Sequence, residues 1–564
     1  MDRQTMMYLA FFLAVAVILL VQYILFKRRQ YRTMCRKVRE QWGKIPDREY
    51  SLEEFEKISH YFKNKKGKDG VLDDITWNDM GMDDIFLLMN TAGSAVGEEY
   101  LYWALRTPQS DPEVLKARSA LADYFVGHQK EREEFAISFA RMGRKKRIAL
   151  ADYIGRLSDM PVPAVWPHIA AMLLLAASIV FFAFRPSMGV GILIGVIVLN
   201  LVTYYKYKGD VGQYFQCMSQ VADLVEYGFR LSRTASDGET LEPYKKRLRE
   251  CCDVLKPVRD QAWILVEGSG IGASLIQAVL DYFCMITHLD LLIFRRISRI
   301  VKDKGEVLDR LMETMGMLEL GLCIGSFREY LGAYCRPVFR KTEKPSISCR
   351  NIYHPLIDDP VKNSIEEDRS VLVTGSNASG KSTFLKTIGV NAILAQTIYT
   401  AAADSFETAF FRIYSSMALT DSLETRESYY MVEIRSLKRI LDALDGEGPV
   451  LCFVDEVLRG TNTVERIAAS SKILESMKDR NVLVFAATHD IELTRLLEGI
   501  YANYHFEEQV EDNDVTFSYK LEKGRAETRN AIRLLSIMGY DSTVVEEARQ
   551  MAERFVRTGE WSLS

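Results

Sequence analysis

The sequence VLVTGSNASGKSTF, Val371 to Phe384, joins an apolar run to a turn rich in Gly, Ser and Asn and then to Gly-Lys-Ser-Thr. Residues 375–382 fit the pattern G-x-x-x-x-G-K-[ST], whose glycines let the backbone wrap around phosphate oxygens at a helix N-terminus. The turn lies between a predicted strand and a predicted helix, as the pattern requires. We therefore predict an α/β nucleotide-binding domain whose chemistry takes place at the carboxyl ends of parallel strands.

This phosphate-binding loop supplies most of the predicted nucleotide contacts. Lys381 is expected to reach the β- and γ-phosphates of ATP, and the Ser382 hydroxyl is expected to ligate Mg²⁺. The other loop residues expected to contact ATP are Gly375, Ser376, Asn377, Ala378, Ser379, Gly380 and Thr383.

Two later segments, PVLCFVDE and NVLVFAATHD, are typical of buried parallel strands and end in residues suited to ATP hydrolysis. Asp455 is placed to hold the Mg²⁺ shell, and Glu456 to orient or deprotonate the attacking water. His489 is suited to hydrogen-bond the γ-phosphate or that water. The order of phosphate loop, long insert, Asp-Glu and Thr-His is typical of ABC-type ATPases, in which two copies hold ATP between them.

The composition is that of a large globular chain with some apolar excess. Its 564 residues suffice for roughly three or four domains. Hydrophobic residues make up 48% and charged residues 26%, and the net charge of −4 excludes a uniformly basic nucleic-acid coat. A local basic patch stays compatible with that charge. The nine cysteines include no C-x-x-C pair, so no zinc or disulfide framework is predicted.

Met6 to Phe26 forms a 21-residue apolar segment whose one strongly polar member is Gln22. Such a segment is long enough to cross about 30 Å of hydrocarbon as a helix. The alternative of a signal peptide is disfavoured because the start MDRQ is barely basic and no small-residue cleavage site follows. Seven basic residues follow directly in Lys27 to Arg39, which places that side in the cytoplasm and the N-terminus outside.

A second apolar block extends from about Val162 to Tyr205 and is interrupted by Arg-Pro-Ser at 185–187. We interpret it as a helical hairpin with two further spans, because basic residues flank it at 144–147 and at Lys206 and Lys208. A hairpin buried in a soluble core is the alternative. The expected location is the inner, or cytoplasmic, membrane, with several passes and with the ATPase domain in the cytoplasm.

The expected fold class is α plus α/β: transmembrane helices, a helical core or lever domain, and a C-terminal ABC-type P-loop ATPase domain with a helical tail. The expected boundaries are an anchor at 1–26, a first section of the helical core at 27–160, the hairpin at 161–208, a second section of the core at 209–345, the ATPase domain at 346–523 and a helix-turn-helix dimerisation segment at 524–564.

The chain resembles the MutS family of DNA mismatch-repair ATPases. TGSNASGKSTFLKTIG is similar to that family's TGPNMGGKST, SYYMVEI (428–434) to S-T-F-M-x-E-M, DEVLRGTNTVE to D-E-x-G-R-G-T-S-T, and FAATHDIELT to F-A-T-H-x-x-E-L. The segment beginning TWNDMGMDD looks like the start of the family's helical core. The resemblance covers about Leu72 to Met142 and Glu306 to Phe555.

The resemblance implies a homodimer that binds ATP and Mg²⁺ and grips double-stranded, branched or mismatched DNA. It implies that Ser428 approaches the γ-phosphate bound by the other subunit, and that Asn363 contacts the nucleotide. Ser379 stands where the family has Gly, which narrows the loop. The segment before Asn363 has no aromatic residue to stack on adenine.

The sequence departs from the repair members at its N-terminal side, where it has no Phe-x-Glu wedge before Leu72. We therefore interpret the chain as a membrane-anchored, DNA-binding ATPase of the MutS type that converts ATP and water to ADP and phosphate. An ATP-switched membrane scaffold without DNA binding is one alternative. Half of an ABC-type transporter is another, although the L-S-G-G-Q of transporters is absent.

Overall fold

The computed structural model describes residues 3–65, 70–144, 164–235, 238–261, 273–340, 344–376, 379–417, 429–458, 460–511, 514–526, 532, 535–536, 538–559 and 561. The chain folds into two compact units. The first, called the helical unit, comprises Met1–Gly67, Met89–Trp103 and Ala117–Tyr330. The second, called the α/β unit, comprises Lys68–Leu88, Ala104–Lys116 and Leu331–Ser564.

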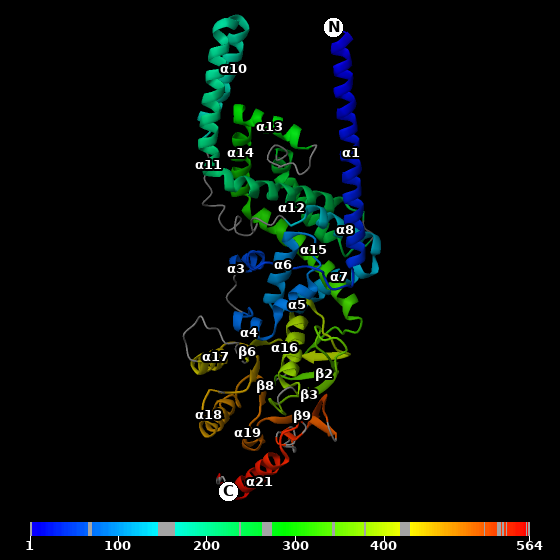
Figure 1. Ribbon diagram of the computed structural model, residues 1–564, viewed down its shortest axis with the longest axis vertical. Coiled ribbons are helices and arrows are strands. Elements are labelled where there is room, and N and C mark those ends of the chain that lie inside the picture. Colours follow the sequence, from blue (N-terminus) through cyan, green and yellow to red (C-terminus); the bar gives the residue numbers. More distant parts are fainter. Residues whose placement is uncertain are drawn as a thin grey trace. The chain divides into compact units, whose positions relative to one another are not determined.

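The helical unit contains, wholly or for the most part, twelve of the described helices (Figure 1). They are α1 (Arg3–Gln41), α2 (Leu52–Ile58), α3 (His60–Asn64), α6 (Ala95–Arg106), α7 (Pro112–Gly127), α8 (Gln129–Met142), α10 (Trp166–Phe184), α11 (Pro186–Arg233), α12 (Glu242–Gln261), α13 (Ala273–Thr287), α14 (Leu289–Asp303) and α15 (Gly305–Leu331). The predicted first span falls within α1, and its crossing of a membrane stays a prediction.

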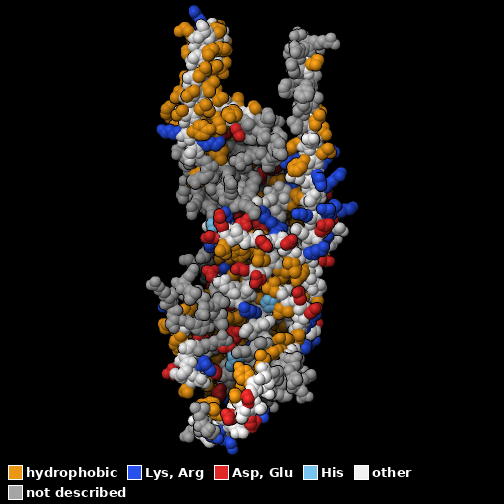
Figure 2. Space-filling view, in the orientation of Figure 1, with side chains coloured by type: hydrophobic (Ala, Val, Ile, Leu, Met, Phe, Trp, Pro, Cys, Tyr) orange, Lys and Arg blue, Asp and Glu red, His pale blue; other side chains and the backbone are white. Residues whose placement is uncertain are grey.

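Helices α10 and α11 form the hairpin that the second apolar block predicts. The chain reverses at Arg185, and Pro186 begins α11 because proline fits the first turn of a helix, whose N–H groups have no partner in the helix. By length and composition, Trp166–Phe184 and Pro186–Gly209 are long and apolar enough to cross a membrane. Only 22% of each apolar window is buried within the chain, and hydrophobic side chains cover the hairpin in Figure 2.

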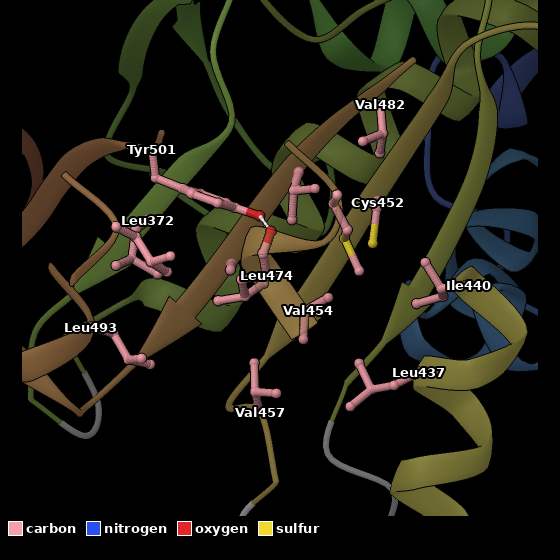
Figure 3. Packing of buried hydrophobic residues seen from close by; sticks show 14 of the residues in the cluster. Leu372, Leu437, Ile440, Cys452, Val454, Val457, Leu474, Val482, Leu493 and Tyr501 are labelled. Atoms are coloured by element: carbon pink, nitrogen blue, oxygen red, sulfur yellow. Dashed lines mark hydrogen bonds between the residues drawn. The ribbon is translucent and has the colours of Figure 1, made fainter. Parts of the chain in front are cut away.

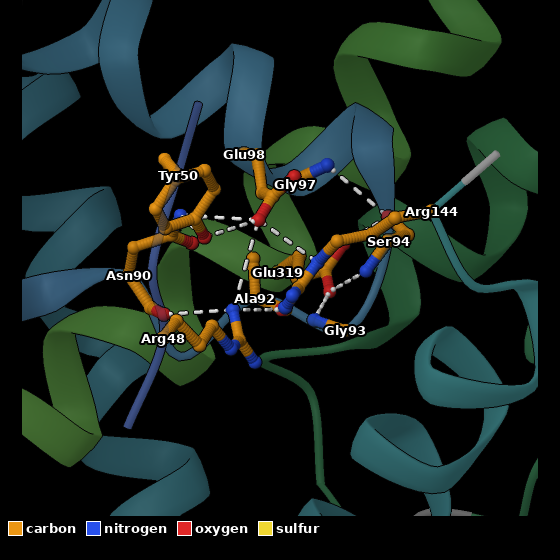
Figure 4. Close-up of polar contacts among 10 residues, drawn as sticks. All are labelled: Arg48, Tyr50, Asn90, Ala92, Gly93, Ser94, Gly97, Glu98, Arg144 and Glu319. Atoms are coloured by element: carbon orange, nitrogen blue, oxygen red, sulfur yellow. Dashed lines mark hydrogen bonds and ion pairs between the residues drawn. The ribbon is translucent and has the colours of Figure 1, made fainter. Parts of the chain in front are cut away.

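A buried polar cluster fastens the start of α6 to α15 (Figure 4). The Glu319 carboxylate accepts hydrogen bonds from the backbone N–H groups of Gly93 (2.5 Å) and Ser94 (2.9 Å) and from the Ser94 hydroxyl. A Cβ on Gly97 would meet Glu319 Oε2 at 2.1 Å, so a larger residue there would displace the carboxylate from this cluster. Beside it, Glu98 Oε1 accepts from Tyr50 (2.7 Å) and pairs with Arg144 (2.8 Å).

We expect Glu319 to lower the free energy of unfolding of the helical unit as the pH rises from 5 to 8. Burial raises the pKa of its carboxyl from 4.5 to about 7, outweighing the hydrogen bonds from Ser94 and Gly93, which act in the opposite direction. Between pH 4.5 and pH 7 the folded state therefore keeps a proton that the unfolded state has lost. The contribution of this proton to stability is complete below pH 4.5 and is lost as the pH rises through 7. The free energy of unfolding should fall by about 3 kcal/mol from pH 4.5 to pH 8 through this group.

Urea unfolding of the detergent-solubilised chain, followed at pH 5 and pH 8, measures this difference. Glu319→Gln removes the titrating group at nearly constant size and should abolish most of the pH dependence. Glu313→Gln, on the partly exposed side of the same helix, is the control and should retain it. An unchanged pH dependence in Glu319→Gln would contradict the assignment.

The α/β unit begins with two short helices and continues with two sheets and their covering helices. Its helices are α4 (Asp74–Asp79), α5 (Met82–Met89), α16 (Lys381–Ile398), α17 (Tyr429–Ala443), α18 (Thr463–Glu475), α19 (Ile491–Leu496) and α21 (Ser542–Thr558). Its strands are β1 (Val338–Phe339), β2 (Ile347–Ile352), β3 (Asn363–Glu367), β4 (Val371–Thr374), β5 (Ser405–Thr408), β6 (Arg412–Ser416), β7 (Val450–Asp455), β8 (Val482–Thr488), β9 (Ala502–Glu511) and β10 (Asp514–Lys523).

The larger sheet has the strand order β10-β9-β4-β8-β7-β6. Strands β4, β7 and β8 are buried along their whole length and pair in parallel, which confirms the three strands predicted from their apolar runs. Strand β10 is the antiparallel edge of this sheet. The smaller sheet, of order β1-β5-β2-β3, was not predicted, because its strands alternate buried and exposed residues over only two to six positions.

A hydrophobic core lies between the larger sheet and helices α17 and α18 (Figure 3). Cys452 and Val454 of β7 face Ile440 of α17, and Tyr501 closes the far end, where its hydroxyl donates to the Leu474 carbonyl at 3.0 Å. Because this core holds the strands in register, their carboxyl ends lie at one edge of the sheet.

Residues 68–88 and 104–116, which the sequence predicts to lie in the first section of the helical core, belong to the α/β unit. Helix α4 is bound to β6: the Ser415 N–H donates to Thr76 Oγ1 (3.2 Å), and Asp79 Oδ2 accepts from the Ser415 hydroxyl (2.6 Å). Asp79 also accepts from the Met417 N–H (3.0 Å). The predicted helix-turn-helix tail is described mainly at α21, and the residues of its first helix lie largely outside the described ranges.

Candidate functional site

The turn between β4 and α16 has the backbone that a phosphate-binding loop needs. Gly375 and Gly380 have φ values of 146° and 106°, in the region that favours glycine, and Gly380 directly precedes α16. A Cβ on residue 375 would lie 2.8 Å from the hydroxyl of Ser379, so that hydroxyl lies close against the Gly375 backbone. Predicted residues Asn377 and Ala378 lie outside the described residues.

Lys381 opens α16 and turns its side chain back into this loop. Its ammonium donates to the carbonyls of Gly375 (2.9 Å) and Ser376 (2.7 Å) and lies 3.3 Å from His489 Nε2. The loop thereby holds a positive charge at its centre, next to the N-terminus of an 18-residue helix. Both features favour a bound anion.

Asp455 ends β7 in a position that suits a hydrated cation. The residue is 8% exposed, and its Oδ1 has no hydrogen-bond partner among the described residues. An orphaned carboxylate oxygen at this depth fits an oxygen-seeking ion such as Mg²⁺, and Ser382 offers a hydroxyl at the start of α16. Across the described ranges of the chain no group of three or more His, Cys, Asp or Glu side chains is placed to hold a metal, so phosphate and water oxygens would have to complete the shell.

Glu456 and His489 are in direct contact. His489 Nε2 lies 2.7 Å from Glu456 Oε1, and the same nitrogen lies 3.3 Å from the Lys381 ammonium. Three residues that the sequence places far apart therefore meet at the carboxyl ends of β4, β7 and β8. The arrangement offers a carboxylate held in place by an imidazole, which suits it to act as a general base.

The loop after β7 is held in an unusual conformation by Glu433, the Glu of the SYYMVEI segment, for which the sequence predicted no role. Glu456 and Leu458 have φ values of 56° and 60°, which side chains other than glycine rarely adopt. Oε1 of Glu433, on α17, accepts the Leu458 N–H at 2.5 Å, and the Glu456 N–H donates to Ala487 (2.9 Å). These two bonds keep the Glu456 carboxylate directed towards His489.

The position of His489 is fixed by its neighbour in sequence. The guanidinium of Arg466, on α18, donates to both carboxylate oxygens of Asp490, at 2.9 and 2.6 Å. Such a two-point contact fixes orientation as well as distance. Arg466 was not predicted from the sequence, since nothing along the chain shows that α18 lies beside the end of β8.

The loop residues face a pocket of about 640 Å³. Predicted residues that line it are Gly380, Lys381, Ser382, Thr383, Asn363 and Glu456. Asn363 lies at its rim, where its amide donates to the Tyr519 carbonyl (3.0 Å) and accepts the Leu521 N–H (2.9 Å). The ring of Tyr519, which was not predicted from the sequence, lines the same pocket and is 45% exposed. An aromatic face suitable for a base is thus provided by β10 instead of the segment before Asn363.

Ser428, predicted to act in the other subunit's site, lies outside the described residues. The helix that it precedes, α17, begins at Tyr429. Its predicted role at a neighbour's γ-phosphate stays a prediction.

Comparison with known proteins identifies relatives of the C-terminal half. Residues 371–556 match the family model for MutS domain V. The chain is 28% identical over 279 residues to the DNA mismatch repair protein MutS of Thermotoga petrophila, which covers 48% of this chain and 34% of that protein. It is 30% identical over 286 residues to that of Lactobacillus acidophilus, covering 48% and 33%.

A similar match is found to a eukaryotic protein. MutS protein homolog 4 of Mus musculus is 30% identical over 292 residues, which covers 48% of this chain and 30% of that protein. The chain therefore spans about a third of the length of the curated relatives that it matches.

Proposed function

Because this chain belongs to the MutS family through its domain V at residues 371–556, we propose that it is a membrane-attached ATPase whose nucleotide cycle controls its grip on DNA. The observation that carries the ATPase activity is the meeting of Lys381, Glu456 and His489 beside the pocket. A phosphate-binding loop alone is common to many nucleotide-binding proteins. Its combination with an oriented carboxylate is what hydrolysis needs.

In the proposed mechanism, the triphosphate lies along the loop, with its γ-phosphate near Lys381 and its base against Tyr519. Mg²⁺, held by Ser382 and Asp455, would supply positive charge to the phosphates. Glu456 then accepts a proton from the attacking water, while His489 keeps that carboxylate in place by donating a hydrogen bond to it. Lys381 must leave its carbonyl partners in the loop to reach the phosphates.

A homodimer follows from the same family membership. Two domains of the ABC type hold ATP between them, and Ser428 would contribute to the partner's site at the N-terminus of α17. ATP binding would close this pair and hydrolysis would reopen it, so that the helical unit alternately grips and releases its substrate. DNA is the proposed substrate because the bacterial relatives are DNA mismatch repair proteins.

Membrane attachment is supported by the exposed apolar surface of α10 and α11. Large side chains such as Leu173, Phe184 and Val202 are 65%, 80% and 63% exposed. Exposed apolar surfaces that extend along two helices are rare in soluble monomers and are typical of contact with lipid. We propose that α10 and α11 span the bilayer together with Met6 to Phe26, which leaves the ATPase domain in the cytoplasm.

Gel-shift binding to homoduplex, mismatched and four-way DNA, with and without ATP, tests the proposed DNA binding. We expect the detergent-solubilised chain to bind DNA with an affinity that falls steeply as salt rises, because phosphate contacts release counterions. Binding should also change when ATP is added. Absence of binding even below physiological salt would refute the DNA proposal and favour an ATP-switched scaffold.

A further inference from the structure

Helix α13 carries an exposed apolar face outside the three predicted spans. Val279, Tyr282 and Phe283 are 62%, 65% and 52% exposed. Their spacing of three and four residues places them on one side of the helix. The only charged residue in Ala273–Thr287 is Asp281. A helix with such a composition needs a covering surface on that side.

The C-terminal end of α13 is attached to the hairpin by a buried polar layer. The side chain of Asn200, on α11, donates to the Ile286 carbonyl of α13 at 2.8 Å. His288, directly after α13, lies 3.0 Å from His168 of α10 through their Nδ1 atoms, and both residues are at most 1% exposed. The C-terminal end of α13 is therefore fixed beside the first turn of α10.

This polar layer marks the level at which the apolar hairpin ends. Tyr204, further along α11, donates to Asp290 at 2.7 Å, and Lys208 lies 3.5 Å from the same carboxylate. In Figure 2, basic side chains appear where the hydrophobic cover of the hairpin stops. Buried polar groups next to exposed basic ones are typical of the boundary between lipid and water.

Figure 1 shows α13 lying across the direction of α10 and α11 at this level. A helix that crosses the hairpin here does not span the bilayer. Its exposed Tyr282 is a residue type found at membrane interfaces, where the ring lies among acyl chains and the hydroxyl faces the headgroups. Phe283 is a residue type found on the apolar face of interfacial helices.

We propose that α13 is an interfacial helix, whose face formed by Val279, Tyr282 and Phe283 lies in the boundary between headgroups and acyl chains of the cytoplasmic leaflet. This inference rests on the proposed membrane attachment of the hairpin. Besides the three proposed spans, α13 would be a fourth segment in contact with lipid, and it connects the bilayer surface directly to α14. A phospholipid bilayer is the partner because Tyr205, exposed on the apolar hairpin, contacts Met285 of α13 through its hydroxyl and so joins this helix to the hairpin surface.

Photocrosslinking in phospholipid nanodiscs tests the proposal. A benzophenone amino acid replaces Tyr282 or Phe283 in the full chain, and mass spectrometry identifies the crosslinked partner. Ile194, 57% exposed on α11, is the reference for the hairpin, and Val126, 38% exposed on α7, is the reference for a surface in water. ATP hydrolysis equal to that of the unsubstituted chain shows that each variant is folded.

We expect phospholipid adducts at 282 and 283 in yields comparable with that at 194 and many-fold above that at 126. The attachment points should lie near the glycerol end of the acyl chains, whereas those at 194 should lie deeper. Lipid adducts at 194 with none at 282 and 283, or with protein adducts there instead, would overturn the interfacial helix and leave the membrane hairpin intact. Absence of lipid adducts at 194 as well would overturn both.

Discussion

Lys381→Ala is expected to reduce ATP hydrolysis by about 100-fold or more, to the background of the assay. The ammonium is the only side-chain cation shown inside the described residues of the phosphate loop, where it contacts the carbonyls of Gly375 and Ser376. Alanine leaves the triphosphate without this charge and leaves two carbonyls without a donor. Phosphate release by the detergent-solubilised chain, at saturating Mg²⁺ and ATP, measures the loss.

Lys386→Ala is the matched control, because Lys386 is on the same helix and does not line the pocket. It should hydrolyse ATP at nearly the unsubstituted rate. Hydrolysis by Lys381→Ala at the unsubstituted rate would show that the loop between β4 and α16 is not the catalytic site.

Glu456→Gln is expected to separate ATP binding from ATP hydrolysis. Glutamine keeps the size of the side chain and its place beside His489 but cannot accept a proton from water. Hydrolysis should therefore fall by about 100- to 10,000-fold, which is the usual contribution of a general base. The affinity for ATP should stay within a few-fold of the unsubstituted value, because the Lys381 contacts are unaffected.

Equilibrium binding of a fluorescent ATP analogue and phosphate release, measured on the same preparation, distinguish the two quantities. Glu475→Gln, an exposed carboxylate of α18 paired with Lys472, is the control and should change neither. An equal loss of binding and of hydrolysis in Glu456→Gln would indicate that this residue supports the loop conformation, in which it has a φ of 56°, and does not act as a base.

The two substitutions also test the dimer proposal. If ATP closes a pair of domains, Glu456→Gln should hold the closed pair for longer, because the nucleotide is no longer hydrolysed. Lys381→Ala should fail to form it. Sedimentation of both variants with and without ATP shows whether closure follows nucleotide binding.

The parallel strands of the α/β unit were predictable because their signal is local. Val371 to Thr374, Val450 to Asp455 and Val482 to Thr488 are continuous apolar runs that end in polar residues, and all three are buried. The break of the hairpin at Arg185 was equally local, since a proline follows it. Catalytic candidates at strand ends could be named for the same reason.

The supporting residues of the site were not predictable in the same way. Glu433 accepts the Leu458 N–H, Arg466 donates to the Asp490 carboxylate, and Tyr519 forms part of the pocket wall. In each case the group that is contacted is distant along the chain. Their roles depend on how α17, α18 and β10 pack, and no short-range pattern reports that packing. Tyr519 is an example: it lies within the irregular stretch of β10 between Phe517 and Leu521, where the register with β9 shifts.

Local sequence was sufficient to predict the phosphate loop, the strand ends and the two apolar arms of the hairpin. Each of these features depends only on the type and order of residues that are neighbours in the chain. The tertiary structure was needed to place residues 68–88 with the α/β unit, to join Lys381 to Glu456 through His489, and to lay α13 across the hairpin. These features depend on contacts between distant segments, whose free energy is gained only when the chain has folded.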